Sequence, residues 1–443
     1  MQFLTRNLDH PIRKLVALFL CWKTLLLLVA LCSPGPGYDT SGSLTEASHG
    51  KEQLPVALRH TISKLIRWDA LYFVKAAERG YSFEQEWAFG WGFTRVIAAC
   101  TEFLKAAGIP HYDGLEAWVA INLAHIAHLI SVLLLFYLSS DVFPGSSQNF
   151  ALTAASLHVI SPAGLFLSAP YAESSCAALS FAGCLLFMKS LNRNGRATAI
   201  HDLYLILAGV SFGIATTFRS NGILNGLLLL EEAFRTLFVL SYERSGATLR
   251  RLLAAGLGGM CVGSGFLLPQ YIAYQEYCGC KDTVPRIWCQ GTLPSIYSFV
   301  QSHYWNCGPF RYWTVSNIPL FVLGTPIFTI LIVSGLWALQ YTAANGPPRA
   351  TKQYDVKSSQ ISFGREGISV LRNMAVSQLF LAGMTLTTAH VQIITRISSA
   401  YPVWLWYLAA SSHEGRLLGI FVKFMVLYGV IQAGLYASFL PPA

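Results

Sequence analysis

Residues 67–87, RWDALYFVKAAERGYSFEQEW, form a polar segment rich in charges and aromatic rings within an otherwise apolar chain. A hydrophobic run at 15–32 precedes this segment, and a long series of hydrophobic runs follows it. Ionisable groups held at or in a bilayer are costly and usually mark a functional site. We therefore expect a membrane protein whose chemistry centres on a polar region beside the bilayer.

The composition places most of the chain in a membrane. Of its 443 residues, 53% are hydrophobic and 12% are charged, whereas a soluble domain carries about 25% charged residues. Backbone groups in lipid must be satisfied internally, so the spans should be helices, of roughly 20 residues each. We predict an all-α polytopic membrane protein with about eleven transmembrane helices, near 15–32, 117–138, 150–169, 172–189, 202–219, 222–242, 252–273, 319–340, 374–390, 399–413 and 417–437.

The basic residues predict the orientation. Most of the net charge of +9 lies in short connectors, which is typical of cytosolic loops and not of a nucleic-acid binding surface. The run 15–32 indicates an uncleaved signal anchor with a cytosolic N-terminus. The segment 88–108 carries several charges and is either a twelfth span or an interfacial helix. Only the interfacial placement leaves every basic connector on the cytosolic side.

This orientation divides a single membrane-embedded domain, 1–443, into two faces. The first lumenal loop is 33–116, a second, cysteine-containing lumenal loop is 274–318, and a polar connector at 341–372 faces the cytosol. The polar residues that could carry chemistry then fall on the lumenal face.

Cysteines gather in the second of these loops. Disulfides persist in oxidising compartments, and four cysteines allow three pairings, which the sequence does not distinguish. A zinc site is the weaker interpretation, because two of these cysteines are separated by a single residue, less than the usual ligand gap. We expect disulfide bonding among Cys278, Cys280, Cys289 and Cys307.

Asp69 is the first candidate for catalysis. It stands at the start of a helical-looking run, where an aspartate often caps the helix. A carboxylate at the membrane surface can also act as a general base on a sugar hydroxyl. Its neighbours Arg67 and Trp68 are candidate substrate contacts.

Other polar residues lie at the lumenal ends of predicted spans. Glu173 would be favoured at a helix start by the helix dipole, and Arg219 interrupts an apolar stretch, where an arginine is costly unless it meets an anion such as phosphate. Aromatic side chains here are either ordinary membrane-surface residues or platforms for sugars. The remaining candidate substrate-binding residues are Glu84, Gln85, Tyr171, Asn221, His303, Trp305, Asn306, His390, Gln392 and Arg396.

The chain lacks the phosphate-cradling GxxxxGK pattern and HExxH. No clear set of metal ligands is present either. We therefore expect no metal and no cofactor beyond the substrates.

Several motifs run in order along nearly the whole chain: RWDALYF at 67–73, ERGYSFEQEWAF at 78–89, SAPYAES at 168–174, TTFRSNGILNG at 216–226, PSIYSFVQSHYWNCG at 294–308, RYWTVSNIPLF at 311–321 and HVQIITRISSAYPVW at 390–404. Together these motifs resemble the second-mannosyltransferase family of glycosylphosphatidylinositol (GPI) anchor assembly, and most closely its fungal members. Many members of the family have prolines after the position of Phe89, whereas this chain has Gly90-Trp91-Gly92, as in fungal variants.

The resemblance implies a GT-C type glycosyltransferase bundle with lumenal interfacial helices in the endoplasmic reticulum membrane. The donor would be dolichyl-phosphate mannose, and the acceptor would be the GPI precursor that carries one mannose, extended in α-1,6 linkage with inversion. Asp69 matches the catalytic acidic residue of the first lumenal loop, while Arg219, Arg396 and Arg67 would stabilise the leaving phosphate. The resemblance also implies a small membrane partner subunit.

Other classes compete with this interpretation. A different dolichyl-phosphate-sugar transferase, acting in N-glycan or protein mannosylation, would use the same fold. A secondary transporter should show inverted repeats and charges deep inside its spans. A scaffold subunit would not need acidic and basic residues converging on one face.

Overall fold

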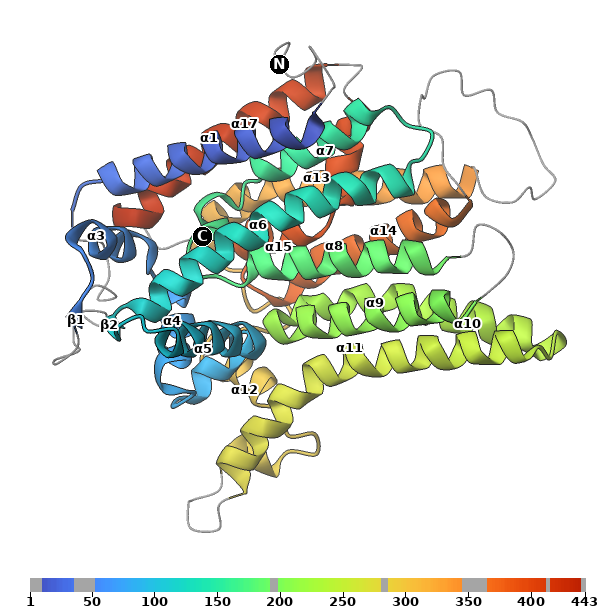
Figure 1. Ribbon diagram of the computed structural model, residues 1–443, viewed down its shortest axis with the longest axis horizontal. Helices are drawn as coiled ribbons and strands as arrows, with labels where there is room; N and C mark the ends of the chain where they lie inside the picture. Colours follow the sequence, from blue (N-terminus) through green and yellow to red (C-terminus); the bar gives the residue numbers. More distant parts are fainter. Residues whose placement is uncertain are drawn as a thin grey trace.

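The computed structural model describes residues 10–35, 52–191, 198–279, 286–344, 365–411 and 415–439. These residues are almost entirely helical (Figure 1). The described helices of one turn or more are α1 (Pro11–Cys32), α3 (Val56–Leu65), α4 (Asp69–Arg79), α5 (Trp91–Ala106), α6 (Leu115–Val142), α7 (Gln148–Val159), α8 (Glu173–Ser190), α9 (Ala199–Phe218), α10 (Gly226–Tyr242), α11 (Gly246–Cys278), α12 (Ile296–His303), α13 (Ile318–Ala344), α14 (Arg365–Thr388), α15 (Ile394–Ile397), α16 (Val403–Ala410) and α17 (Arg416–Gly434).

Short turns and one small ladder connect these helices. The two-residue strands β1 (Glu52–Gln53) and β2 (Tyr112–Asp113) pair in parallel, which is a minor exception to the all-α prediction. The short helical turns are η2 (Glu84–Ala88), η3 (Gly164–Leu167), η4 (Ser220–Asn225), η5 (Ile287–Gln290), η6 (Val315–Asn317), η7 (Val391–Ile393), η8 (Ser398–Ala400) and the π-helical η10 (Leu435–Phe439).

Six described helical segments are long and apolar enough to cross a membrane: α1, α6, α9, α11, α13 together with η6, and α17. The other predicted windows contain shorter or more polar helices. Among them, α8 has 18 residues, α10 has 17, and α14 has 24 residues that include charged side chains. The chain is thus a multi-pass helical membrane protein, and the larger number of spans stays a prediction.

Two predicted spans are wrong as continuous helices. The window 150–169 holds α7, of 12 residues, and then breaks before η3, because Pro162 cannot continue the backbone ladder. The part of the window 399–413 that the structure describes contains η8 and α16, and α16 has 8 residues and begins after Pro402. Both segments are buried among other helices, so their apolar character reflects protein packing and not exposure to lipid.

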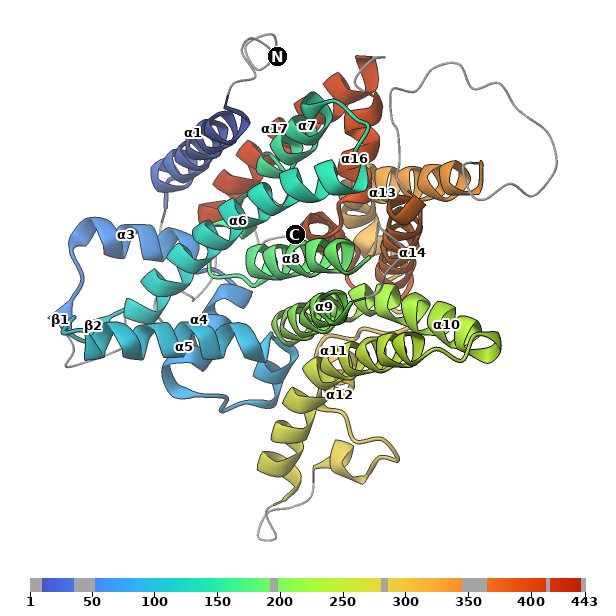
Figure 2. The same ribbon diagram turned by 45° about the vertical axis from the view of Figure 1, so that its right-hand side comes forward.

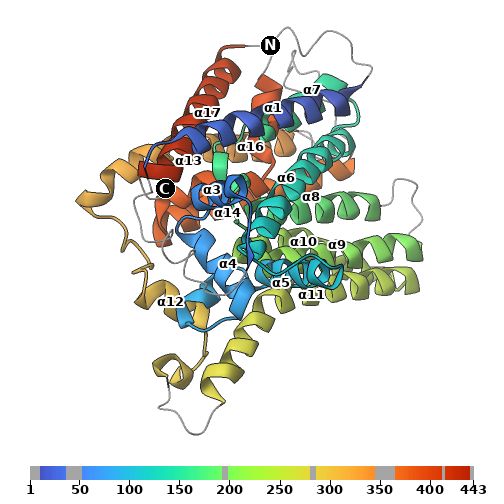
Figure 3. The same ribbon diagram turned by 60° about the vertical axis from the view of Figure 1, so that its left-hand side comes forward.

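The long helices α6, α9 and α11 run in roughly the same direction across the view in Figure 1, and α3, α4, α5 and α12 gather toward one end of the bundle. Figures 2 and 3 show the same separation from two further sides. Glycines allow α9 and α11 to pack closely, since Gly209 and Gly213 of α9 lie against the backbone of Gly258 and Gly265 in α11. Small residues at helix crossings are a common packing device in membranes.

Lys23 shows how a charge is accommodated inside this bundle. It lies in α1 and is buried. Its Nζ donates hydrogen bonds to the carbonyl of Leu167 and to Oγ of Ser168, both at 2.8 Å. The ammonium group therefore faces the protein interior and does not extend to the membrane surface.

The segment 88–108 is mostly α5, whose 16 residues are too few for a span of roughly 20. It packs against α4 at the end of the bundle (Figure 3). Gly90 and Gly92, at its start, lie directly against Phe218 and Thr217, the last residues of α9. A side chain at either glycine would collide with α9, so these glycines place α5 at the end of that helix.

Candidate active site

A cavity of about 730 Å³ lies where the end of α9 and η4 meet α4, α11, α12 and the segment from α14 to α15. Its size is in the usual range for a ligand-binding site, about 300–1,000 Å³. Segments far apart in the sequence contribute to its wall. The predicted site residues that line it are Trp68, Asp69, Arg219, Asn221, Trp305, His390, Gln392 and Arg396.

Asp69 is the first residue of α4 and borders this cavity with a side chain that is 23% exposed. The N-cap position of α4 belongs to Trp68, and Asp69 is already inside the helix, so the capping interpretation of Asp69 is wrong. The residue before it, Trp68, has a φ of 50°. Positive φ is uncommon for a residue with a bulky side chain and often marks a functional site. The Trp68–Asp69 turn therefore presents both side chains to the cavity.

Arg396, in α15, holds the Asp69 carboxylate. Its Nη1 and Nη2 both donate to Oδ2 at 3.1 Å, and its guanidinium group lies over the rings of Phe166 and Tyr171, at 4.7 and 5.2 Å. The other carboxylate oxygen of Asp69, Oδ1, accepts no hydrogen bond from the described part of the chain. Burial lowers the pKa of Arg396, but the nearby carboxylates of Glu173 and Asp69 outweigh it and raise the pKa above its ordinary value.

Glu173, at the start of α8, contacts both arginines of the site. Its Oε1 accepts a hydrogen bond from Nη1 of Arg219 at 2.8 Å and lies 3.3 Å from Nε of Arg396. Arg219 directly follows α9 and borders the cavity. Two carboxylates and two guanidinium groups thus form one cluster, and the described residues that bring positive charge to the cavity wall are the two arginines.

Aromatic and amide groups form the opposite part of the wall. The ring of Trp305 lies edge to face with Phe89 at 5.3 Å, and its carbonyl contacts Nε2 of His390 at 3.0 Å. His390 also stacks on Tyr312, whose hydroxyl donates to Oε1 of Gln392 at 3.0 Å. Flat rings beside amide and imidazole groups are suited to a sugar, which offers apolar faces and hydroxyl groups.

Several predicted site residues lie outside the cavity wall. Arg67, Tyr171 and Glu173 are buried behind it. The hydroxyl of Tyr171 donates to the carbonyl of Arg67 at 3.0 Å, which anchors the backbone just before Asp69. These residues can therefore affect a ligand in the cavity only indirectly, by positioning the residues that line the cavity. Gln85, His303 and Asn306 also do not line the cavity, and the latter two are exposed.

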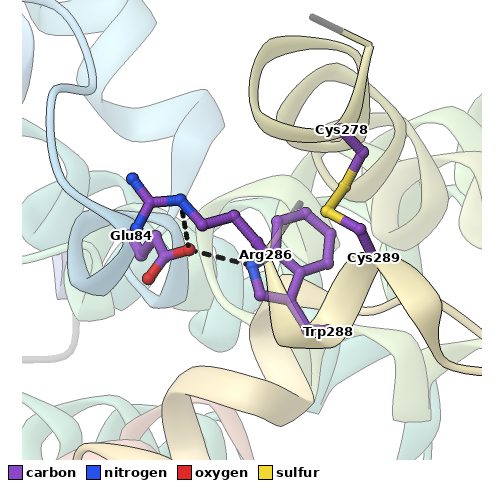
Figure 4. Close-up of a disulfide and its surroundings, with 5 residues drawn as sticks. All are labelled: Glu84, Cys278, Arg286, Trp288 and Cys289. Carbon is purple, nitrogen blue, oxygen red and sulfur yellow. Dashed lines mark hydrogen bonds and ion pairs between the residues drawn. A yellow bond between two sulfur atoms is a disulfide. The ribbon is translucent and has the colours of Figure 1, made fainter. Parts of the chain in front are cut away.

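Glu84 also lies away from the cavity and joins two parts of the chain (Figure 4). Its Oε1 accepts a hydrogen bond from Nε1 of Trp288 at 2.9 Å, and its Oε2 accepts one from the hydroxyl of Tyr304 at 3.0 Å. The Arg286 Nε lies 3.7 Å from the same carboxylate. Glu84 therefore connects η2 to the cysteine-containing loop, and its role as a substrate contact stays a prediction.

Cys278 and Cys289 form a disulfide beside this contact, with Cα atoms 5.7 Å apart (Figure 4). Cys307, which was expected to take part in disulfide bonding, has a free thiol. It lies beyond α12 and borders the cavity near His390, and burial raises the pKa of its thiol. Cys280 lies outside the described residues.

The sequence interpretation missed several residues of the cavity wall. Tyr72 is three positions after Asp69 and hence on the same face of α4, where it stacks on Phe89 at 4.7 Å. Tyr297 and Gln301 are four positions apart on α12 and both line the cavity. The hydroxyls of Tyr297 and Ser220 lie 2.9 Å apart. Helical spacing from Asp69 could have identified Tyr72, whereas the contact of α12 with η4 has no local sequence signal.

No group of three His, Cys, Asp or Glu residues in the described ranges is placed to hold a metal ion. What the cavity does offer is a partly exposed carboxylate, two guanidinium groups and an aromatic wall. This set can accept a proton, bind a phosphate and hold a sugar. It is the arrangement expected of a transferase that acts on a sugar phosphate at the end of a membrane bundle.

Comparisons with known proteins agree with this class. The family model described as mannosyltransferase (PIG-V) matches residues 12–443. A GPI mannosyltransferase 2 from Chaetomium globosum is 46% identical over 98% of this chain and 97% of its own length. The protein of the same description from Gibberella zeae is 40% identical over 98% of each chain, and that from Yarrowia lipolytica is 31% identical over 97% of this chain and 98% of its own.

The chain therefore belongs to the mannosyltransferase (PIG-V) family. It is an enzyme that transfers mannose, and not a transporter or a scaffold subunit. Among solved structures, the Archaeoglobus fulgidus oligosaccharyltransferase covers 98% of this chain and 55% of its own, with 12% identity and a TM-score of 0.47. That likeness is too weak to support an argument.

Proposed function

We propose that the chain transfers the second mannose of the GPI anchor. The donor is dolichyl-phosphate mannose, the acceptor is the GPI precursor with one mannose, and the new linkage is α-1,6. The near-complete coverage of the GPI mannosyltransferase 2 relatives supports this assignment. The proposal extends to a GT-C type fold in the endoplasmic reticulum membrane, with a cytosolic N-terminus and the cavity on the lumenal side.

Asp69 is the proposed general base, since its carboxylate borders the cavity and is paired with Arg396. The 6-hydroxyl oxygen of the acceptor mannose attacks C1 of the donor sugar and forms the new C–O bond. Asp69 accepts the hydroxyl proton as this bond forms. The Arg396 hydrogen bonds to Oδ2 leave Oδ1 for the hydroxyl. General-base catalysis of this kind is worth about 10²–10⁴ in rate.

The bond from C1 to the phosphate oxygen breaks in the same displacement, and its electron pair leaves with dolichyl phosphate. A single displacement converts the β-linked donor into an α-linked product. The leaving phosphate gains negative charge and needs no proton, so positive groups fixed beside it stabilise the transition state. Arg219 and Arg396 are the candidates for this role, and the burial of Arg67 removes it from direct contact.

The surroundings of the site fit two lipid-linked substrates. Apolar side chains of η4, α11 and α14 line the cavity beside the polar wall, including Ile223, Phe266 and Met384. The hydrocarbon chains of the substrates would leave between helices toward the membrane. The small membrane partner subunit suggested by the family resemblance belongs to this proposal as well.

The test is depletion of the enzyme in a conditional strain, followed by complementation. Depletion should accumulate the GPI precursor that carries one mannose. Wild-type enzyme should clear it, and Asp69→Asn should fail to do so at equal protein level, with transfer lowered about 10²–10⁴-fold. Asp113→Asn, which replaces an aspartate outside the cavity wall, is the matched control and should clear the intermediate.

Two outcomes would contradict the proposal. Near-normal transfer by Asp69→Asn would remove the assigned base. Accumulation of a truncated N-glycan precursor, with normal GPI precursors, would instead favour the neighbouring dolichyl-phosphate-sugar pathway.

A further inference from the structure

Glu173 lies behind the cavity wall and connects the two arginines that reach the cavity. It is 1% exposed and does not line the cavity. Its Oε1 takes the hydrogen bond from Arg219 at 2.8 Å and lies 3.3 Å from the Arg396 Nε. A substrate bound in the cavity can thus be affected by Glu173 only through the two guanidinium groups.

The second oxygen of this carboxylate, Oε2, is buried and has no hydrogen-bond partner among the described residues. A buried acceptor without a partner lowers stability. The buried carboxylate of Glu232 provides the contrast, because both of its oxygens accept hydrogen bonds, from Arg235 and Arg251. Asp202, which does not border the cavity, also has a buried oxygen without a hydrogen-bond partner among the described residues, so incomplete bonding alone does not mark a site. In Glu173 it is combined with contacts to both arginines of the cavity wall, and these contacts connect the carboxylate to the site.

The short segment 171–173 contacts Arg396 and the backbone just before Asp69, and so it holds both sides of the Asp69–Arg396 ion pair. The Tyr171 ring lies 5.2 Å from the Arg396 guanidinium group, and its hydroxyl holds the backbone of Arg67, two residues before Asp69. Glu173 adds a negative charge between the two arginines. Without this charge the guanidinium groups would repel each other, and Arg396 would keep only the Asp69 carboxylate among its described acidic contacts.

We propose that Glu173 is a positioning residue that fixes the two arginines for the leaving phosphate and orients Asp69 through Arg396. The inference rests on the proposed function, in which these groups act on the sugar phosphate. Its consequence is a specific kinetic pattern. Removing the negative charge leaves both cations able to bind the donor, so ground-state binding persists. The alignment of carboxylate and guanidinium groups is lost, and misplacement by about 1 Å can cost on the order of 10² in rate.

The experiment measures kcat and the donor KM of the full-length enzyme in membranes, per folded molecule, with dolichyl-phosphate mannose and the mono-mannosylated acceptor. Glu173→Gln, which keeps the shape and removes the charge, should lower kcat on the order of 10²-fold without raising the donor KM. Glu173→Asp restores the charge on a shorter side chain and should recover part of kcat. Glu232→Gln is the matched control, also buried and paired with arginine. It should change the yield of folded enzyme and leave kcat unaltered.

Four results would overturn the inference. A raised donor KM with normal kcat would make Glu173 a substrate contact. Normal values of both constants, with less folded enzyme, would make it purely structural. Equal kcat for Glu173→Asp and Glu173→Gln would exclude a role for the negative charge of Glu173. If Glu173→Gln does not fold, a normal kcat for Glu173→Asp would show that the length of the glutamate side chain is not needed to position the arginines. Asp69→Asn in the same assay separates the proposal for Asp69 from the proposal for Glu173. If Asp69→Asn is inactive and Glu173→Gln has normal activity, the positioning role of Glu173 is contradicted and the proposed general base is not.

Discussion

Two clusters of arginine and carboxylate groups lie at opposite ends of α9. Since this helix has 20 residues, they are about 30 Å apart, which is also the approximate thickness of the bilayer core. The cluster at the C-terminal end contains Asp69, Glu173, Arg219 and Arg396, and the cluster at the N-terminal end contains Asp202, Glu232, Arg250 and Arg251.

The two clusters differ in what their central arginine bonds to. Arg251 donates through Nε to Glu232, through Nη1 to the carbonyl of His201 and through Nη2 to Ser190, at 2.7, 3.2 and 3.1 Å. The Nε of Arg396 is buried at 3.3 Å from Glu173 without the geometry of a hydrogen bond. Only the cluster of Arg396 borders the 730 Å³ cavity. Buried charge is common to both clusters, and it is the cavity that makes the cluster of Arg396 the candidate active site.

Replacing Arg396 by Ala tests the contrast between the two clusters, and it should have the largest effect on turnover. The variant removes the partner of Asp69 and one positive group for the phosphate, so turnover per folded enzyme should fall about 10²–10³-fold. Arg396→Lys keeps the charge but cannot donate twice to Oδ2 and should be intermediate. Turnover near the wild-type value in both variants would contradict the role of this cluster.

Replacing Arg251 by Ala should affect stability instead. Glu232 then remains paired with Arg235 and Asp202 with Arg250, and losing one buried hydrogen bond to a charged group costs about 1.5–3 kcal/mol. Thermal unfolding of the purified enzyme in detergent measures this loss. Turnover of the remaining folded enzyme should be unchanged, and a large fall in turnover without loss of stability would mean that the N-terminal cluster also serves the reaction.

Glu84→Gln tests a carboxylate that is near the active site in sequence but remote from the cavity. Glu84 accepts hydrogen bonds from Trp288 and Tyr304, and an amide can accept only through its oxygen. One of the two donors then loses its acceptor, and because Tyr304 is 41% exposed and can bond to water, the free energy of unfolding should fall by only about 1 kcal/mol. Kinetic constants of the folded variant should match those of wild type. A raised donor KM would restore Glu84 to the substrate-binding set.

His303→Ala should have the smallest effect. The side chain is exposed, stacks on Phe299 and does not border the cavity. Stability should stay within about 0.5 kcal/mol of wild type, with normal transfer in the membrane assay. A clear loss of transfer would show that the cavity wall extends beyond α12.

The sequence predicted the class of fold and the main groups of the site. Charge-poor composition and long apolar runs indicate membrane helices, and Asp69, Arg219 and Arg396 stand out because ionisable groups are costly there. Local sequence patterns do not show which segments become buried by contacts with distant parts of the chain. Apolar windows do not distinguish α7 or α16, which are surrounded by protein, from lipid-facing spans. Likewise Glu84 and Glu173 look alike as acidic residues near the membrane, and only tertiary packing separates their roles.

The glycines at the start of α5 have a consequence for this site. Gly90 and Gly92 allow that helix to touch the last turn of α9, and Arg219 follows this turn directly. The chain from Asp69 to α5 is therefore anchored against the segment that carries Arg219. A methyl group at residue 90 would act as a spacer between the two segments and would separate Asp69, the proposed general base, from Arg219, the proposed phosphate-binding group, while leaving both side chains chemically intact.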